Sequence, residues 1–127
     1  KFDFGRPRLV CPQISNKRKL RRLHFIFCSP MDILGNSCNY LSSDTNTLKK
    51  LYIILNSSLL DWRFKLTSSN NHINNYELDD LPICDLSKVD INKKFLRQEE
   101  LDDYVSVLYG LSNNDNNYIK GKYNEII

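Results

Sequence analysis

The sequence predicts an α+β domain in which short strands pack on one long buried helix and a helical segment follows. Three features of the sequence lead to this prediction. Short apolar stretches broken by Pro, Gly and Ser come first, a long helical periodicity spans about 46–66, and a shorter one spans about 94–109. The chain has 127 residues, 41% of them hydrophobic and 26% charged, which is the size and composition of one globular domain.

Three stretches in the first third of the chain are typical of strands. Residues 7–14 are extended and partly apolar, but Pro12 cannot donate a hydrogen bond to a neighbouring strand, so we expect this strand at a sheet edge. Residues 23–28 (LHFIFC) follow a basic run and give the clearest strand pattern. A turn signal at 35–36 then precedes a third strand over 37–41 (SCNYL).

The long helix is predicted from about 46 to 66, after an N-cap cluster at 42–44. At about 1.5 Å per residue it would be roughly 30 Å long, enough to cross the domain. Apolar residues occupy two of its faces, so we expect it to be buried on two sides, with Trp62 packed in the core. The main apolar face consists of Leu48, Leu51, Leu55, Leu59, Trp62 and Leu66.

The C-terminal part carries clear helix-end signals. A helix is predicted over about 94–109, and Gly110 stands where a left-handed residue ends such a helix. Ser112, three residues before Asp115, opens a last short helix towards Lys120. The apolar face of the first of these helices consists of Leu101, Tyr104, Val105 and Leu108.

Motifs for catalysis are absent from the sequence. The four glycines are too far apart for a nucleotide-binding loop, and no Asp or Glu precedes a lysine at the spacing of common metal-dependent nucleases. The four cysteines and two histidines lack the paired spacing of zinc sites, so we expect reduced core thiols and no metal. No apolar run approaches the length of a membrane span. We therefore expect a cytoplasmic protein without catalytic residues of its own.

Charge is distributed unevenly along the chain. Residues 1–66 hold 12 Lys and Arg against 4 Asp and Glu, whereas residues 67–127 hold 6 against 11. The first part therefore carries a net charge of +8 and the second part −5. A basic half is typical of proteins that bind polyanions, and the acidic half would keep the chain soluble or dock it against a basic neighbour.

Phosphate contacts are best assigned to the basic run KRKLRR and the arginines shortly before it. Each phosphate neutralised by such a side chain releases condensed counterions, which makes binding salt-dependent. The alternative is a solvated turn between two strands. The candidates are Arg6, Arg8, Lys17, Arg18, Lys19, Arg21 and Arg22.

A polar loop rich in asparagine follows the long helix. The Asn carboxamide can form two hydrogen bonds with the edge of adenine in the major groove. Alternatively, these asparagines stabilise a turn and cap the next helix. Asn74 is assigned to capping, because Asn74 and Glu77 have the spacing of a capping box before a short helical turn over 76–80. The candidates for base contacts are Asn70, Asn71, His72 and Asn75.

Five stretches are informative together: RPRLVCPQIS from Arg6, then GNSCNYL, LNSSLLDWRFKL, ELDDLPI and the tail LDDYVSVLYGLSNND. Their sequence and order resemble the TaqI-like C-terminal specificity domain of adenine-specific DNA methyltransferases and of restriction enzymes that combine methylation with cleavage. The resemblance implies a small, twisted, mixed β-sheet around a long helix, facing the major groove of DNA. It also implies a target-recognition domain over 1–88 and a helical extension, packed on or beside it, over 89–127.

The function implied by this resemblance is sequence-specific recognition of double-stranded DNA for a methyltransferase domain in a longer parent chain. The fragment would need no cofactor, while the parent would use S-adenosylmethionine. The four prolines never adjoin, so the Asn-Pro-Pro-Tyr motif of adenine methyltransferases lies outside this chain. One alternative is a structural domain that docks the methyltransferase to an endonuclease partner, has no DNA affinity and exposes an apolar patch over 101–108. Another is a small nuclease with a degenerate metal site.

Overall fold

The computed structural model of the protein describes residues 8–12, 21–28, 38–68, 73 and 75–125. Over these residues the chain forms a small α+β domain with a three-stranded antiparallel sheet and five α-helices. The α+β class predicted from the sequence is therefore confirmed. The details of the sheet and of the long helix differ from the prediction.

The sheet has the strand order β2-β1-β3, so the first strand in the chain is the central one. The strands are β1 (Arg8–Pro12), β2 (Ile26–Cys28) and β3 (Cys38–Ser42), and both pairings are antiparallel. The predicted edge position of β1 and the predicted mixed sheet are therefore wrong for these strands. Pro12 is tolerated because it ends β1 and lies beyond the residues that pair with β2. The strand expected over 23–28 is regular only from Ile26.

The single long helix expected from the sequence is two helices. The first, α1 (Thr45–Leu55), ends at Asn56, and α2 (Ser58–Thr67) begins after Ser57, whose backbone is extended at φ −79° and ψ 151°. The Ser57 hydroxyl accepts a hydrogen bond from the Leu60 main-chain N–H at 3.3 Å and so caps α2. The apolar periodicity continues across this break, which is why periodicity alone predicted one helix.

The C-terminal part is helical, as expected. Gly110 stands at the end of the first of the two helices predicted there. Gly110 has a φ of 71°, a conformation that favours glycine. The main-chain N–H groups of Gly110 and Leu111 donate to the carbonyls of Val107 and Ser106, both at 3.0 Å. This pairing is a Schellman motif, and it confirms the predicted helix end. The elements of this part are α3 (Asn75–Asp79), the 3-10 helix η1 (Leu86–Lys88), α4 (Gln98–Leu108) and α5 (Asn113–Glu125).

Side chains cap two helix starts at the positions that the sequence predicts. The Asp44 carboxylate accepts from the Thr47 main-chain N–H at 3.0 Å at the start of α1. Before α5, the Asp115 N–H donates to the Ser112 hydroxyl at 3.1 Å, and the Ser112 N–H donates back to the Asp115 carboxylate at 3.4 Å. These local signals are confirmed, although α5 extends to Glu125 rather than ending near Lys120.

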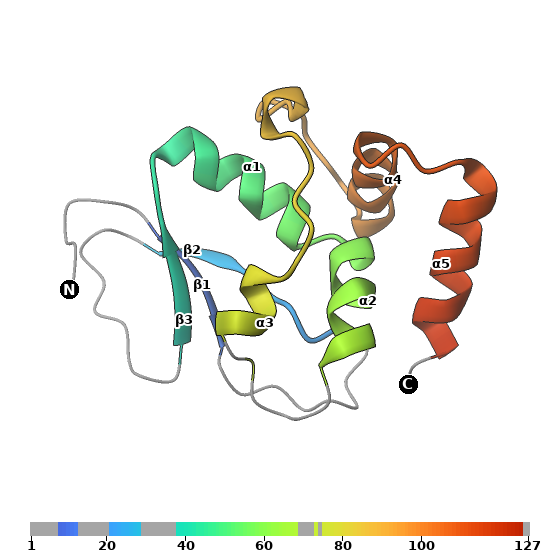
Figure 1. The fold of residues 1–127 in the computed structure, drawn as a ribbon. Coiled ribbons are helices and arrows are strands. Elements are labelled where there is room, and N and C mark those ends of the chain that lie inside the picture. The colour runs from blue at the N-terminus through green and yellow to red at the C-terminus, as the bar shows by residue number, and fades with distance from the viewer. Residues whose placement is uncertain (1–7, 13–20, 29–37, 69–72, 74, 126–127) are drawn as a thin grey trace.

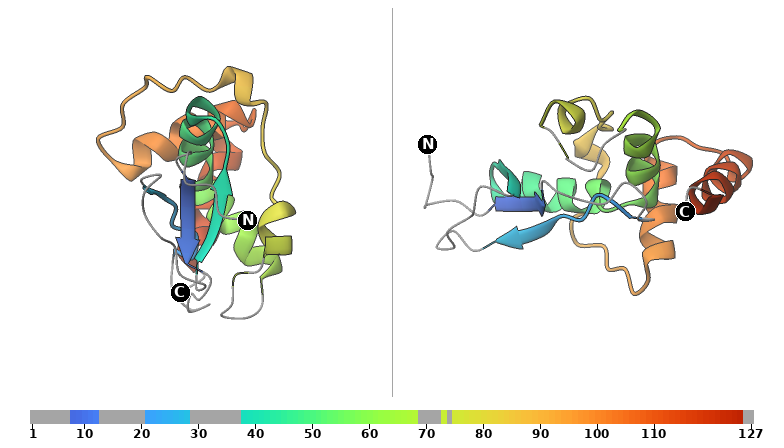
Figure 2. Two further views of the ribbon diagram at one scale, coloured as in Figure 1. Left: turned by 90° about the vertical axis from the view of Figure 1, so that its left-hand side faces the viewer. Right: turned by 90° about the horizontal axis from the view of Figure 1, so that it is seen from below.

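One hydrophobic core joins the sheet to the helices. In Figure 1, α1 lies over the sheet and contacts β1, while α2 lies between α3 and α5. Figure 1 and the right-hand view of Figure 2 show the sheet and α5 at opposite ends of the molecule. The predicted apolar face of α4 is confirmed, because Val105 is fully buried and its neighbours on that face pack against the core. Fully buried core residues include Leu9, Leu23, Leu48, Ile54, Phe64, Ile73 and Val105.

Candidate nucleic-acid interface

The residues predicted to contact DNA fall into two groups. Arg8, Arg21, Arg22 and Asn75 belong to the described part of the chain, and Asn75 is the first residue of α3. The remaining candidates lie outside the described residues: Arg6, Lys17, Arg18, Lys19, Asn70, Asn71 and His72. Asn74, which the sequence assigns to capping, also lies outside them. The described residues next to the two predicted segments are Arg21 and Arg22 at the end of the basic run, and Ser68 and Ile73 on either side of the asparagine loop.

Arg8 and Arg22 are buried rather than exposed. Arg8 lies in the central strand and is 0% exposed, and Arg22 is 2% exposed. The Arg22 guanidinium donates from Nη1 to the Ser68 hydroxyl at 2.7 Å and lies 5.1 Å from the ring centroid of Phe64. Burial lowers the pKa of Arg22, and the carboxylates of Glu77 and Asp61 oppose this shift. Contacts from these two arginines to surface phosphates do not fit this arrangement, and both side chains belong to the interior.

Arg21 lies across the junction between α1 and α2. Its Nη1 donates to the Asn56 carbonyl at 3.1 Å, and its Nη2 donates to the Ser58 hydroxyl at 2.8 Å. The Asn56 carbonyl is one of those left without a helical partner at the end of α1, so Arg21 serves a helix C-terminus, where a cation is favourable. The side chain is half-buried, which leaves part of its charge near the surface.

The main chain of residues 22–25 is held by two side chains from the same junction. The Asp61 carboxylate accepts from the Arg22 N–H at 3.0 Å and from the Leu23 N–H at 2.7 Å. The Asn56 carboxamide accepts from the Phe25 N–H at 2.8 Å and donates to the Phe25 carbonyl at 3.0 Å. We call this arrangement of Asn56 and Asp61 the junction clamp. It fixes the chain between the basic run and β2 without a regular strand.

Asp61 has a third donor from the far end of the chain. It is 0% exposed, and its Oδ2 accepts from the Tyr123 hydroxyl of α5 at 2.8 Å. Burial and the neighbouring Asp61 carboxylate raise the pKa of Tyr123, so the hydroxyl stays protonated and can donate. A buried carboxylate with three donors joins α2, α5 and the segment before β2 into one unit.

Cations gather beside the clamp. Lys65 of α2 places its Nζ 5.4 Å from the ring centroid of Tyr123. Burial lowers the pKa of Lys65, Arg22 and Arg21 lower it further, and Asp61 opposes them. Of the electrostatic influences on Lys65, that of the Asp61 carboxylate is the largest, so this buried anion partly balances the cations beside the clamp.

The flanks of the two predicted DNA-contacting segments meet directly. Arg22 is the last residue of the basic run and Ser68 precedes the asparagine loop, and their side chains share the 2.7 Å hydrogen bond described above. On the other side of the loop, the carbonyl of Ile73 accepts from the Asn39 carboxamide of β3 at 2.9 Å. Figure 1 shows the end of β1, the start of β3, the end of α2 and α3 at the same lower side of the molecule. The described anchors of both segments are thus at one end of the domain.

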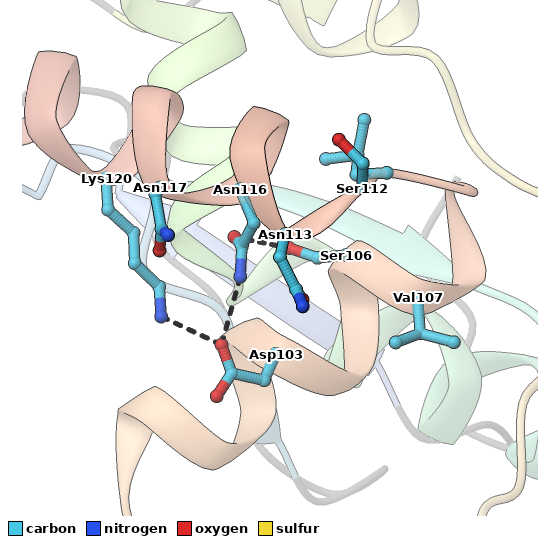
Figure 3. Close-up of a pocket in the computed structure, with 9 residues that line it drawn as sticks. Asp103, Ser106, Val107, Ser112, Asn113, Asn116, Asn117 and Lys120 are labelled. Carbon is cyan, nitrogen blue, oxygen red and sulfur yellow. Dashed lines mark hydrogen bonds and ion pairs between the residues drawn. The ribbon is translucent and has the colours of Figure 1, made fainter.

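A second polar network lies between α4 and α5 (Figure 3). The Asp103 carboxylate accepts from Lys120 Nζ at 2.8 Å and from the Asn116 carboxamide at 3.1 Å, and the Ser106 hydroxyl donates to Asn116 at 2.8 Å. Lys120 lowers the pKa of Asp103, and Asp103 raises the pKa of Lys120. These residues line a hollow of about 400 Å³ that is open to solvent.

Among the described residues, no group of three or more His, Cys, Asp or Glu side chains is placed to hold a metal ion. Cys11 is buried and Cys84 is half-buried, and neither forms a disulfide within the described part of the chain. No helix in the described ranges is both long and apolar enough to cross a bilayer.

Sequence reasoning did not identify the clamp residues Asn56 and Asp61 or the anchor Asn39 as structurally important. In the sequence, these three residues are distinguished only because they lie in stretches that resemble the specificity domain. In one of these stretches, Asn56 and Asp61 are five residues apart. Comparisons of the chain with family models, with curated proteins and with solved structures give no match.

Proposed function

We propose that the chain is a sequence-specific recognition module for double-stranded DNA, belonging to an adenine-specific DNA methyltransferase or a related restriction enzyme. The observation that supports the proposal most is the Arg22–Ser68 hydrogen bond of 2.7 Å. It brings together the last residue of the basic run and the residue that precedes the asparagine loop. A module that reads DNA needs phosphate contacts to set its orientation and base contacts to select the sequence. Two such segments that are attached at one place on the domain can contact the same stretch of duplex.

The two segments have different roles in this proposal. Lys17, Arg18 and Lys19, with the half-buried Arg21, contact phosphates, which carry no sequence information. Asn70, Asn71, His72 and Asn75 face base edges in the major groove. Arg8 and Arg22 are removed from the set of DNA contacts, because both are buried, and instead stabilise the scaffold.

The chemistry of methyl transfer belongs to a separate catalytic domain in this proposal. That domain would hold S-adenosylmethionine and extrude the target adenine, while the present chain keeps the duplex in register. The junction clamp supports this role, since residues in reading loops must be held by a rigid scaffold to select a sequence. The recognised sequence depends on the loop residues themselves.

The proposal is tested by removing charge from the basic run. We expect the triple variant Lys17→Gln, Arg18→Gln, Lys19→Gln to bind all duplexes more weakly and to reduce the slope of log affinity against log salt by about 0.9 for each lost phosphate contact. Fluorescence anisotropy with a labelled duplex at several salt concentrations measures both quantities. A matched control is the double variant Lys93→Gln, Lys94→Gln, whose exposed side chains lie in the acidic half. Equal slopes for the wild type and the triple variant would refute phosphate contacts by this run.

A second candidate function is a docking domain without DNA affinity. One observation favours it: an apolar hollow at the surface of α2, beside Trp62. The docking function also predicts an exposed apolar patch over 101–108. This patch does not support the function, because within that range only Val107 is a strongly exposed apolar residue, at 73%. The anisotropy measurement separates the two functions, since the docking domain alone predicts no binding of any duplex.

A further inference from the structure

A small apolar hollow lies where α2 meets the turn between α4 and α5. It has a volume of about 220 Å³ and is lined by Leu59, Trp62, Arg63, Tyr109, Leu111 and Ile119, among others. Pockets for small ligands and cofactors usually measure about 300–1,000 Å³, so this hollow is small for such a molecule. It is suited to a single large apolar side chain.

Hydrogen bonds hold two residues of the lining in position. The Tyr109 hydroxyl donates to the Pro82 carbonyl at 2.6 Å and accepts from the Cys84 N–H at 3.3 Å. Burial raises the pKa of Tyr109 to about 12, which keeps this hydroxyl a donor at all ordinary pH values. Leu111 is fixed by the Schellman motif that ends α4, through its N–H bond to Ser106 at 3.0 Å. A preformed hollow loses little conformational entropy on binding.

The face of α2 that carries the hollow is apolar towards solvent. Leu59, Trp62 and Leu66 follow each other at helical spacing, and Leu66, the last of them, is 56% exposed. In Figure 1, α3 and α5 lie on opposite sides of this helix, and Ile119 of α5 lines the hollow. Trp, Tyr and Arg are the residues that most often dominate binding energy at protein interfaces, and all three types line this hollow.

One cation stands at the rim. Arg63 is half-buried, and within the described part of the chain it forms no hydrogen bond or ion pair. The Tyr109 hydroxyl is already satisfied by its two hydrogen bonds, and the leucines, Pro82 and Ile119 of the lining offer only apolar surface, against which burying an unpaired polar group would be unfavourable. The combination of an apolar hollow and an unpaired guanidinium matches an apolar side chain next to a carboxylate.

We propose that this hollow is the docking site for a peptide segment of a partner protein, which inserts one large apolar side chain and places a carboxylate against Arg63. The partner is therefore an acidic and apolar segment. The site is separate from the anchors of the DNA-contacting segments at Ser68 and Ile73. It does not depend on the proposed function, so either can fail while the other holds.

The single tryptophan of the chain makes occupancy measurable, because Trp62 lines the hollow. The probes are two acetylated, amidated pentapeptides, one with a leucine between two pairs of glutamates and one with the same leucine between two pairs of lysines. We expect the glutamate peptide to shift Trp62 emission and to bind about two- to fivefold more tightly than the lysine peptide at low salt. Identical titration curves for the two peptides, or no change in emission up to millimolar peptide, would overturn the proposal.

Variants make the test independent of folding defects. The charge reversal Arg63→Glu should invert the preference, so that the lysine peptide binds more tightly than the glutamate peptide. Leu111→Asp should abolish both emission changes, whereas Val107→Asp, at an exposed valine outside the hollow, should leave them as in the wild type. If Leu111→Asp does not fold, the peptide preference of Arg63→Glu tests the proposal by itself. A preference of Arg63→Glu for the glutamate peptide, as in the wild type, would contradict the proposal.

Discussion

Asp61 and Asp103 are both carboxylates that join distant parts of the chain, but water reaches only one of them. Asp61 is 0% exposed and accepts from two main-chain N–H groups and the Tyr123 hydroxyl. Asp103 has a side chain that is 52% exposed and accepts from Lys120 and Asn116. At Asp103, water can replace each lost partner, whereas at Asp61 it cannot. We therefore expect a similar number of hydrogen bonds to stabilise the two places very differently.

The comparison is tested most strongly by the same substitution at both positions. Asp61→Ala leaves three buried donors without an acceptor, and each costs about 1–3 kcal/mol, so we expect a loss of at least about 3 kcal/mol in the free energy of unfolding. Asp103→Ala should lose less than about 1 kcal/mol, because its ion pair is exposed. Urea denaturation followed by circular dichroism measures both. Similar losses for the two variants would show that burial does not set the difference.

A smaller effect is expected at the other half of the junction clamp. Asn56→Ala removes both hydrogen bonds to Phe25, and we expect it to lower the free energy of unfolding by about 1–3 kcal/mol. Asn117→Ala is the matched control, since Asn117 is exposed beside the Asp103 network. The same denaturation experiment applies. If Asn117→Ala lowered the free energy of unfolding as much as Asn56→Ala does, the hydrogen bonds of the junction clamp would not explain the loss.

The smallest effect concerns pH. Burial and Asp61 raise the pKa of Tyr123 in the folded state, so its contribution is complete below the unfolded value near 10 and is lost as pH rises through the raised pKa. Between pH 8 and pH 11, we expect the wild type to lose about 1 kcal/mol more stability than Tyr123→Phe. Tyr118→Phe, at an exposed tyrosine of α5, should behave as the wild type does. The absence of any difference between Tyr123→Phe and the wild type would exclude this linkage.

The parts of the fold that depend on neighbouring residues could be predicted from the sequence. The cap at Asp44, the glycine end at Gly110 and the reciprocal pair of Ser112 and Asp115 each involve residues within a few positions of each other. The break at Ser57 is also local, but its signal is a single serine inside a continuous apolar pattern. The central place of β1 could not be predicted, because it depends on where Pro12 falls relative to two partner strands.

The candidate site was less predictable than the fold. Charge in a sequence indicates exposure, and this indication fails for Arg8 and Arg22, which are buried. Two partners of the Arg22 side chain, Ser68 and Phe64, are more than forty residues away along the chain, so no local pattern indicates them. The proximity of the described ends of the two predicted segments likewise depends on tertiary contacts alone.

The distance along the chain between Asp61 and its hydroxyl donor has a consequence for biosynthesis. Tyr123 lies 62 residues after Asp61. At the usual speed of translation, about 5–20 residues per second, a growing chain therefore waits about 3–12 seconds before that donor is made. During this interval Asp61 lacks the Tyr123 donor, and the domain can reach its final arrangement only after α5 has left the ribosome.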